Sequence, residues 1–429
     1  MQLNSWGNYP KINSNIKSLE SKVDLRDYLK KIDEFIPYGN GRSYGDSALY
    51  KNILYCKPYN YFLDFDENNG ILHCQSGVML GEIVEFFLPR GWFLEVTPGT
   101  KLITVGGAIA ADVHGKNHHK QGTFSKSVLE FNLMLPNGEI VNVKKNDELF
   151  LATCGGMGLT GVILDVKLKL KKVKSAYVNQ TTIKTKNLAQ TFEAFERYKD
   201  YNYSVAWIDC LNQKNIGKCL LMVGDFCDDS DFEVQNKRGV NIPLYFPNFT
   251  LNKWSIKVFN YLYYSRVKDS VVKNRVDFNS FFYPLDSIDN WNRIYGKNGF
   301  LQYQFIVPKQ KSFDALEEIL SKIAKNKMGS FLAVLKLYGK ENENYLSFPI
   351  EGYSLALDFK IEPRLFDFLD ELDKIVVKYG GRIYLAKDSR VKRDIFESGY
   401  DKIDIFRKIR KSYEMDKKFN SLQSKRLYL

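Results

Sequence analysis

The chain has 429 residues, more than one ordinary hydrophobic core holds, so its length predicts two or three packed units. Hydrophobic residues at 44% and charged residues at 26% are typical of a globular protein and exclude a disordered or fibrous one. Lys and Arg number 62 against 50 Asp and Glu. The formal charge of +12 favours anionic partners, such as phosphates, lipid headgroups or nucleic acid, without choosing among them.

The start of the sequence lacks the basic region followed by an apolar one that marks a signal peptide, and no window approaches the ~20 apolar residues of a membrane span. We therefore expect a cytoplasmic protein or one bound peripherally at the inner face of the plasma membrane. Six cysteines without a C-x-x-C pair predict buried free thiols. His114 and His118 lack the acidic residue of a zinc-protease motif between them, so we expect no metal site.

Up to about residue 172, short apolar runs alternate with glycine-rich loops at 38–46, 98–107 and 154–161, which predicts one α+β unit. The first loop does not open a helix, as a Rossmann fingerprint must, and no glycine loop continues into the Gly-Lys-Ser/Thr of a P-loop. Three such loops in one unit indicate a long polar ligand contacted by backbone N–H groups, and a dinucleotide has that shape.

The second loop leads into residues 104–116, which are rich in glycine and alanine. This composition predicts either a helix start that presses against a flat ring or a pyrophosphate, or tight packing of a helix on a sheet. We interpret His114, beside Gly115, as a hydrogen-bonding group in a cofactor loop.

After residue 172 the glycine density falls, and amphipathic helices are predicted at 192–198, 313–323 and 365–379. Weak periodicity over 240–279 predicts a loop-like segment. At the end of the chain, residues 387–429 hold thirteen basic and seven acidic residues, which is half of the net charge.

Three strands predicted at 300–307, 331–338 and 353–361 each have an apolar side and a side with polar groups, by period-two alternation. One interpretation is an antiparallel sheet with one solvated face. The other is a sheet that roofs a cavity, with amides and a lysine pointing into it.

Together the three glycine loops resemble the FAD domain of the vanillyl-alcohol-oxidase superfamily, and within it the decaprenylphosphoryl-ribose oxidase family most closely. The similarity continues through 300–305, 346–350 and 384–390, so it covers nearly the whole chain. It implies an α+β, two-domain flavoprotein. The implied parts are a PCMH-type FAD-binding domain at 1–175, an antiparallel-sheet substrate-binding domain at 176–381, and a C-terminal segment at 382–429 that completes the FAD domain.

The resemblance also implies that FAD is bound, and bound non-covalently, because Arg42 stands where many superfamily members carry the histidine that links flavin covalently. The implied FAD contacts are Pro37, Tyr38, Gly39, Asn40, Gly41, Arg42, Ser43, Tyr44, Gly45, Asp46, Ser47, Gly99, Thr104, Val105, Gly106, Gly107, His114, Gly115, Lys116, Asn117, Ile163 and Tyr384.

The implied reaction oxidises the 2-hydroxyl of a polyprenyl-phosphoryl-β-D-ribose to a 2-keto intermediate. It is the oxidase half of an epimerase that leads to polyprenyl-phosphoryl-arabinose in cell-envelope glycan biosynthesis. A separate NAD(P)H-dependent keto-sugar reductase would be the partner. Lys387 and Tyr44 are the implied catalytic residues. The implied substrate contacts are Gln302, Gln304, Lys336, Trp207, Tyr283 and Asp358.

Two departures leave the sugar and the lipid open, because Ser354 and Ala356 replace an asparagine and a cysteine of the family. An aldonolactone or alditol oxidase acting on a free sugar is the alternative with the same fold. A basic protein that binds membrane surfaces or nucleic acid is the alternative from another class. We expect no nucleic-acid partner, since no basic stripe interleaved with aromatic residues appears.

Overall fold

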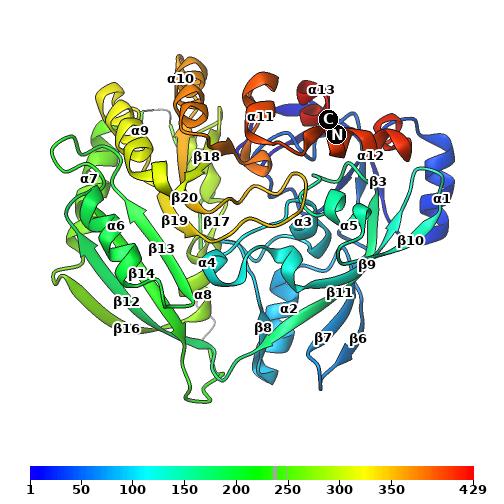
Figure 1. The fold of residues 1–429 in the computed structure, drawn as a ribbon, viewed down its shortest axis with the longest axis horizontal. Coiled ribbons are helices and arrows are strands. Elements are labelled where there is room, and N and C mark those ends of the chain that lie inside the picture. The colour runs from blue at the N-terminus through cyan, green and yellow to red at the C-terminus, as the bar shows by residue number, and fades with distance from the viewer. Residues whose placement is uncertain (235–238, 248) are drawn as a thin grey trace.

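The computed structural model describes residues 1–234, 239–247 and 249–429. Helices and mostly antiparallel sheets form two halves that lie side by side in Figure 1, which confirms the predicted α+β class. One half is built on the N-terminal strands, and the other on a single eight-stranded sheet.

The first half contains a small parallel sheet in the order β3-β5-β4 and a larger antiparallel sheet in the order β10-β9-β11-β7-β6, with β8 added to β11. The strands are β1 (Gln2–Asn4), β2 (Lys11–Asn13), β3 (Asn15–Ser18), β4 (Ile36–Tyr38), β5 (Asn52–Tyr55), β6 (Phe62–Asp66), β7 (Ile71–Gln75), β8 (Trp92–Leu94), β9 (Val128–Met134), β10 (Ile140–Lys144) and β11 (Val162–Lys172). The helices are α1 (Lys22–Lys31), α2 (Leu80–Phe87), α3 (Val105–Ala110), α4 (His118–Gln121) and α5 (Glu148–Thr153).

The second half is an antiparallel sheet in the order β16-β12-β14-β13-β19-β20-β18-β21. Its strands are β12 (Tyr177–Thr185), β13 (Tyr203–Ile208), β14 (Cys219–Phe226), β16 (Val271–Asp277), β18 (Phe300–Pro308), β19 (Ala333–Tyr338), β20 (Gly352–Lys360) and β21 (Arg382–Ile383), with a short parallel pair β15 (Val240–Asn241) and β17 (Ile288–Asp289) outside it. The helices are α6 (Leu188–Arg197), α7 (Lys253–Ser265), α8 (Phe278–Phe282), α9 (Ser312–Asn326) and α10 (Leu365–Lys378).

Alternation along β18, β19 and β20 separates two faces of this sheet. Tyr303, Leu335 and Leu357 belong to the buried core that includes residues of α6, α9 and α10. Gln304 and Lys336 point the other way and line a cavity. Of the two interpretations of the strand pattern, the sheet that roofs a cavity is therefore correct.

The C-terminal segment carries α11 (Arg393–Gly399), α12 (Ile403–Ser412) and α13 (Leu422–Leu427), and it returns to the first half (Figure 1). Phe35 and Phe419 pair as an isolated parallel bridge, and Phe35 N–H donates to the Lys418 carbonyl at 2.9 Å. Lys418 Nζ in turn donates to the carbonyls of Leu29 and Ile32. The backbone and side chain of Lys418 thus fasten the segment to the first half.

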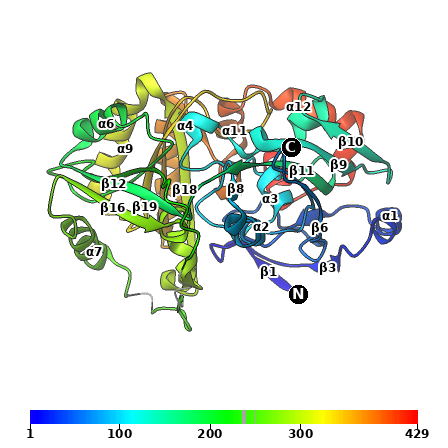
Figure 2. The same cartoon turned by 90° about the horizontal axis from the view of Figure 1, so that it is seen from below.

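The expectation of a loop-like segment over 240–279 is wrong, because α7 and β16 lie within it. Asn252 begins α7, since its side chain accepts hydrogen bonds from the N–H groups of Trp254 and Ser255. Figure 2 shows α7 standing apart from α6 and α9, across the eight-stranded sheet.

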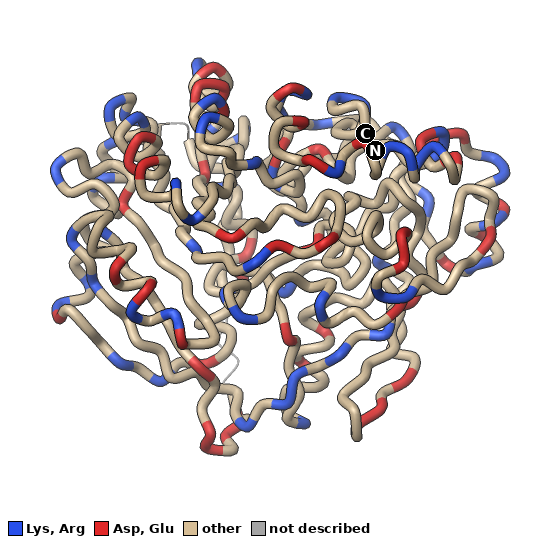
Figure 3. Tube along the Cα trace, viewed as in Figure 1, with Lys and Arg blue, Asp and Glu red and all other residues tan. Residues whose placement is uncertain are grey.

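Acidic and basic segments alternate along the described trace in Figure 3. None of the helices in the described ranges is both long and apolar enough to cross a membrane. All six cysteines are buried and unbonded to one another, as predicted.

Candidate active site

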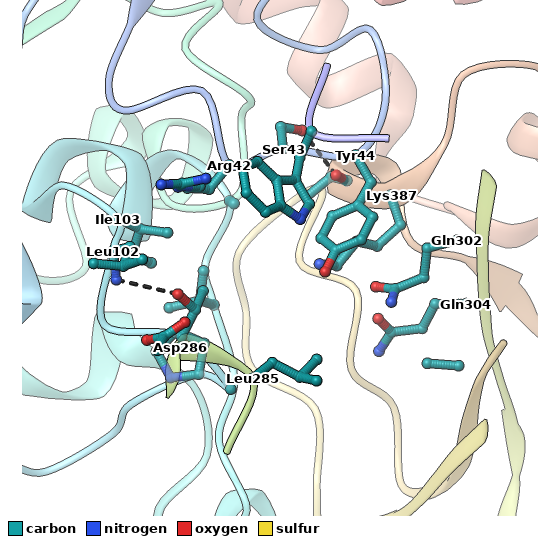
Figure 4. Close-up of a pocket in the computed structure, with 18 of the residues that line it drawn as sticks. Arg42, Ser43, Tyr44, Leu102, Ile103, Leu285, Asp286, Gln302, Gln304 and Lys387 are labelled. Atoms are coloured by element: carbon teal, nitrogen blue, oxygen red, sulfur yellow. Dashed lines mark hydrogen bonds between the residues drawn. The ribbon is translucent and has the colours of Figure 1, made fainter. Parts of the chain in front are cut away.

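A cavity of about 1250 Å³ lies between the two halves. One wall is formed by the loops that follow β4 and precede α3, and the other by the polar face of the eight-stranded sheet. Figure 4 shows Gln302 and Gln304 pointing from β18 toward Tyr44 and Lys387. Residues from the start, the middle and the end of the sequence therefore meet at one site.

The first loop offers a row of unused backbone donors. None of the five N–H groups of residues 39–43 donates a hydrogen bond within the described ranges, and all five residues line the cavity. Gly41 adopts a left-handed φ of +61°, where a side chain would also collide with the Tyr38 hydroxyl. Successive free N–H groups in a turn form a concave anion site, so this loop can cradle the phosphates of a dinucleotide.

The second loop, unlike the first, leads into a helix whose first N–H groups already donate hydrogen bonds. Thr104 begins α3 by accepting a hydrogen bond from Gly107 N–H, while Gly106 N–H donates to the Ser76 carbonyl at 2.8 Å. A Cβ on Gly106 would lie 3.0 Å from the Ser76 Cβ. The first turn of α3 therefore has its donors satisfied internally, and Gly106 serves close packing, while Gly106 and Gly107 present a flat, small surface to the cavity.

Most of the residues predicted to contact FAD line this one cavity. They are Pro37, Tyr38, Gly39, Asn40, Gly41, Arg42, Ser43, Tyr44, Ser47, Gly99, Thr104, Gly106, Gly107, His114, Lys116, Ile163 and Tyr384. The structure does not place Gly45, Asp46, Val105, Gly115 or Asn117 in its wall.

Those five residues support the wall from behind. Gly45 leaves room for the Asp388 carbonyl, which a Cβ would approach to 1.6 Å, and the Asp46 carboxylate binds Arg426. Val105 is fully buried, and Asn117 Nδ2 donates to the Glu95 carbonyl at 2.7 Å. A direct contact between FAD and these five residues stays a prediction, because they lie in the same loops but do not line the cavity.

The cavity wall also carries polar atoms that lack a partner. Arg42 Nε, Ser76 Oγ and His114 Nδ1 are buried and make no hydrogen bond within the described ranges. Buried polar atoms are ordinarily paired, so their number here indicates a polar ligand. With the free N–H groups of the first loop, these atoms fit FAD.

Replacing Gly41 by alanine is expected to weaken FAD binding about tenfold, because strain in a left-handed residue costs about 1–3 kcal/mol and this loop is the proposed cradle. Fluorescence titration of the apoprotein with FAD measures the change. Gly138→Ala is the matched control, since Gly138 has a φ of +83° in the turn between β9 and β10, away from the cavity. Equal affinities of the two variants would contradict the cradle.

Lys387 lies at the end of the short 3₁₀ turn Leu385–Lys387, which begins one residue after the end of β21. Its ammonium nitrogen lies 3.7 Å from the centre of the Tyr44 ring. Burial lowers the pKa of Lys387 to about 7, although the nearby Asp358 carboxylate opposes this shift. The hydrogen bond from Tyr44 N–H to the Ala386 carbonyl, at 3.2 Å, ties the two catalytic candidates together.

Asp358 lies behind the cavity wall instead of in it. It is 1% exposed and accepts a hydrogen bond of 2.6 Å from Gln302 Nε2. Burial raises the pKa of Asp358 to about 7. The expected substrate contact is therefore not in place, and Asp358 fixes the side chain of Gln302, which does line the cavity.

Gln304 fixes the tautomer of His114. Its amide nitrogen lies 3.2 Å from His114 Nε2 and 3.3 Å from Ser354 Oγ. An amide N–H can only donate, so Nε2 accepts and the proton of the neutral ring lies on Nδ1. Burial, aided by the charge of Lys336, holds the pKa of His114 well below its usual range. His114 is therefore a neutral donor in the cavity wall at physiological pH.

Two further lysines, Lys336 and Lys116, line the same cavity. Burial lowers the pKa of Lys336 to about 8 and that of Lys116 to about 7, the latter with help from Lys336. Lys116 Nζ donates to the Phe281 carbonyl. The cavity thus concentrates amines that exchange protons near neutral pH.

Of the two predicted aromatic wall residues, Trp207 lines the cavity and Tyr283 does not. The Tyr283 hydroxyl is buried against Thr97 Oγ1 at 2.7 Å. Sequence reasoning missed an apolar end of the cavity formed by Leu285, Ile294, Phe259, Tyr263, Phe331 and Leu332. The aromatic content of the chain, 14% of its residues, is the only signal for it in the sequence.

Comparison with known proteins agrees with this geometry. A model of the FAD binding domain matches residues 20–144. Over its whole length the chain is 34% identical to decaprenylphosphoryl-beta-D-ribose oxidase of Mycolicibacterium smegmatis, of which it covers 97%. It is 28% identical, over 82% of its length, to an uncharacterized protein of Streptomyces coelicolor, which it covers completely. A delta(24)-sterol reductase of Pisum sativum is 30% identical to this chain, over 27% of this chain's length and 21% of the reductase's length.

Proposed function

The chain belongs to the family of FAD-dependent oxidoreductases that includes the mycobacterial decaprenylphosphoryl-beta-D-ribose oxidase, and from this premise we propose that it oxidises the 2-hydroxyl of a polyprenyl-phosphoryl-β-D-ribose to the 2-keto sugar. The observation that carries the proposal is the meeting of Lys387, Tyr44 and Gln302 in one cavity with the free N–H groups of the first loop. FAD, when bound, supplies the hydride acceptor.

We assign the sugar end of the cavity to the polar face of β18, β19 and β20. Gln302, Gln304 and Lys336 line it; Asp358 holds the side chain of Gln302, and His114 holds that of Gln304. Such fixed polar groups orient a hydroxyl without reorganising, which favours one reactive geometry. The wall positions Ser354 and Ala356 also line the cavity and set which sugar fits.

Lys387 is the proton acceptor in this proposal. An amine with a pKa of about 7 is substantially neutral at physiological pH, so its nitrogen can accept the proton of the sugar hydroxyl. Tyr44 has a pKa well above its usual range, chiefly through burial, so its phenol stays protonated and serves as a hydrogen-bond donor.

The rate of flavin reduction by substrate is expected to rise with pH and to level off above about 7. The lysine accepts a proton only when neutral, and it is protonated below its pKa of about 7. Stopped-flow measurement of the rate constant across this range gives the profile. A rate that falls as pH rises through 7 would contradict the assignment of Lys387 as the base.

A product assay separates this proposal from the alternative with the same fold. The purified holoenzyme is incubated with polyprenyl-phosphoryl ribose, and in parallel with free aldonolactones and alditols. The proposal predicts a 2-keto lipid-linked sugar and no turnover of the free sugars. Turnover of the free sugars alone would establish the alternative.

The proposal extends to the organisation of the chain and its partners. Residues 1–175 and 382–429 would bind FAD, and 176–381 would bind substrate, supported by the bridge from Phe35 to Phe419. A separate NAD(P)H-dependent reductase would restore the hydroxyl with inverted configuration. Because the substrate is anchored in a bilayer, the enzyme would work at the inner face of the plasma membrane.

A further inference from the structure

Helix α7 carries apolar side chains on the face that points away from the protein. Trp254, Val258, Tyr261 and Leu262 follow the i, i+4, i+7, i+8 spacing of one helical stripe and are 66%, 58%, 66% and 62% exposed. Helices of a folded domain usually bury such a stripe, so this surface is built to be covered.

The opposite face of α7 is firmly held. Asn260 is 1% exposed and its amide donates to Asp209 Oδ1 at 2.8 Å, while the Tyr264 hydroxyl donates to the Thr185 carbonyl at 2.9 Å. The exposed stripe is therefore presented by a fixed helix, and it does not result from a helix that has detached from its core.

The segment before α7 extends this surface. Leu244 and Phe249 are 75% and 77% exposed, and Tyr245 and Phe246 are also exposed. Arg293 anchors the segment by donating to the carbonyls of Ile242 and Pro243. We call the exposed apolar side chains of Leu244, Tyr245, Phe246, Phe249 and α7 the apolar platform.

The charge around the platform indicates what covers it. Residues 253–268 contain four basic residues, Lys253, Lys257, Arg266 and Lys268, and no acidic one. All four are exposed. Apolar side chains flanked by lysine and arginine on an amphipathic helix are the signature of binding to the surface of a bilayer that contains anionic lipid.

The platform is continuous with the cavity. Phe259 and Tyr263 of α7 line the cavity at its apolar end, as does Arg266, the residue that follows the helix. Phe259 packs on Phe331, with ring centres 5.4 Å apart, and Tyr263 packs on Trp207 at 4.9 Å. A hydrocarbon chain that leaves the cavity along these rings passes directly onto the platform.

We propose that the apolar platform docks the enzyme on an anionic bilayer, so that a substrate tail passes from the membrane along α7 into the cavity. This inference rests on the proposed function for the identity of the tail, but the docking itself requires no turnover. In the docked state Trp254, Leu262 and Phe249 enter the boundary between headgroups and acyl chains, and the four basic side chains contact lipid phosphates.

The test uses the full-length holoenzyme and vesicles of phosphatidylcholine with or without phosphatidylglycerol. We expect sedimentation with the anionic vesicles and a blue shift of tryptophan fluorescence. The double variant Trp254→Ser, Leu262→Ser is expected to lower the vesicle partition coefficient at least about tenfold, because two large apolar side chains are lost from the contact. Lys253→Glu with Lys257→Glu is expected to abolish the preference for anionic vesicles.

The matched control is Tyr61→Ser with Leu63→Ser, which removes two exposed apolar side chains from the first half, 70% and 46% exposed. It is expected to bind vesicles like the unmodified protein. Three results would overturn the proposal: no binding to anionic vesicles, equal loss in the control, or a dimer that the Trp254 variant dissociates, since a second copy would then cover the platform. Unchanged oxidation of a short-chain, water-soluble phosphoribose by the Trp254 variant separates failed docking from failed catalysis.

Discussion

Lys387→Ala is expected to slow flavin reduction by substrate about 10²- to 10⁴-fold, the usual contribution of a positioned general base. FAD binding is expected to persist, because the free N–H groups of the first loop are untouched. Anaerobic stopped-flow absorbance gives the rate, and the visible flavin spectrum reports occupancy.

Lys387→Arg distinguishes two possible roles of this lysine, acceptance of the hydroxyl proton and stabilisation of developing negative charge. Arginine stays charged, so it keeps a stabilising positive charge and cannot accept a proton near neutral pH. We expect it to be as slow as the alanine variant. Lys392→Ala, at an exposed residue of the same segment, is the control and is expected to be unchanged. An arginine variant with near-normal rates would contradict the base and support charge stabilisation.

Arg426→Met is expected to lower the free energy of unfolding by about 3–5 kcal/mol, because it leaves two buried carboxylates without their cation. Arg426 Nη2 lies 2.8 Å from both Asp46 and Asp388, whose side chains are 6% and 3% exposed. Burial raises the pKa of Asp46 to about 6, against the pull of Arg426. Urea denaturation followed by circular dichroism measures the loss.

The same variant is expected to weaken FAD binding, since Asp46 adjoins the first loop and Asp388 adjoins Lys387. Arg393→Ala removes an exposed arginine of the same C-terminal segment, which pairs with Glu397, and serves as control with little change in stability expected. A loss of stability no larger than in the control would show that the buried cluster does not hold the two ends of the chain together.

The strands of the substrate sheet could be predicted from the sequence, because period-two alternation is a local property. The elements that cover their polar face could not be predicted from the sequence. They belong to the first half, more than a hundred residues away from Gln304 and Lys336 along the chain. Likewise, Gly45 and Asp46 were predicted to contact the cofactor. Their contacts with Asp388 and Arg426 could not be predicted, because those residues lie near the other end of the chain.

Helix α7 escaped prediction for a related reason. Its inward face carries Ile256 and Tyr263, and its outward face carries Trp254, Val258 and Leu262. Apolar residues on both faces blur the 3.6-residue period. A helix with one apolar face can be predicted from the 3.6-residue period of its apolar residues. A helix that meets the protein on one side and, as we propose, a bilayer on the other cannot.

We propose that the protein oxidises a lipid-linked ribose in this cavity, with Lys387 as the base. The most direct test of this proposal is anaerobic mixing of the FAD-loaded protein with polyprenyl-phosphoryl-β-D-ribose while flavin absorbance is recorded. We expect rapid bleaching of the flavin absorbance, slowed at least about a hundredfold in the Lys387→Ala variant. A flavin that stays oxidised with this substrate, or that bleaches equally fast in the variant, would contradict it.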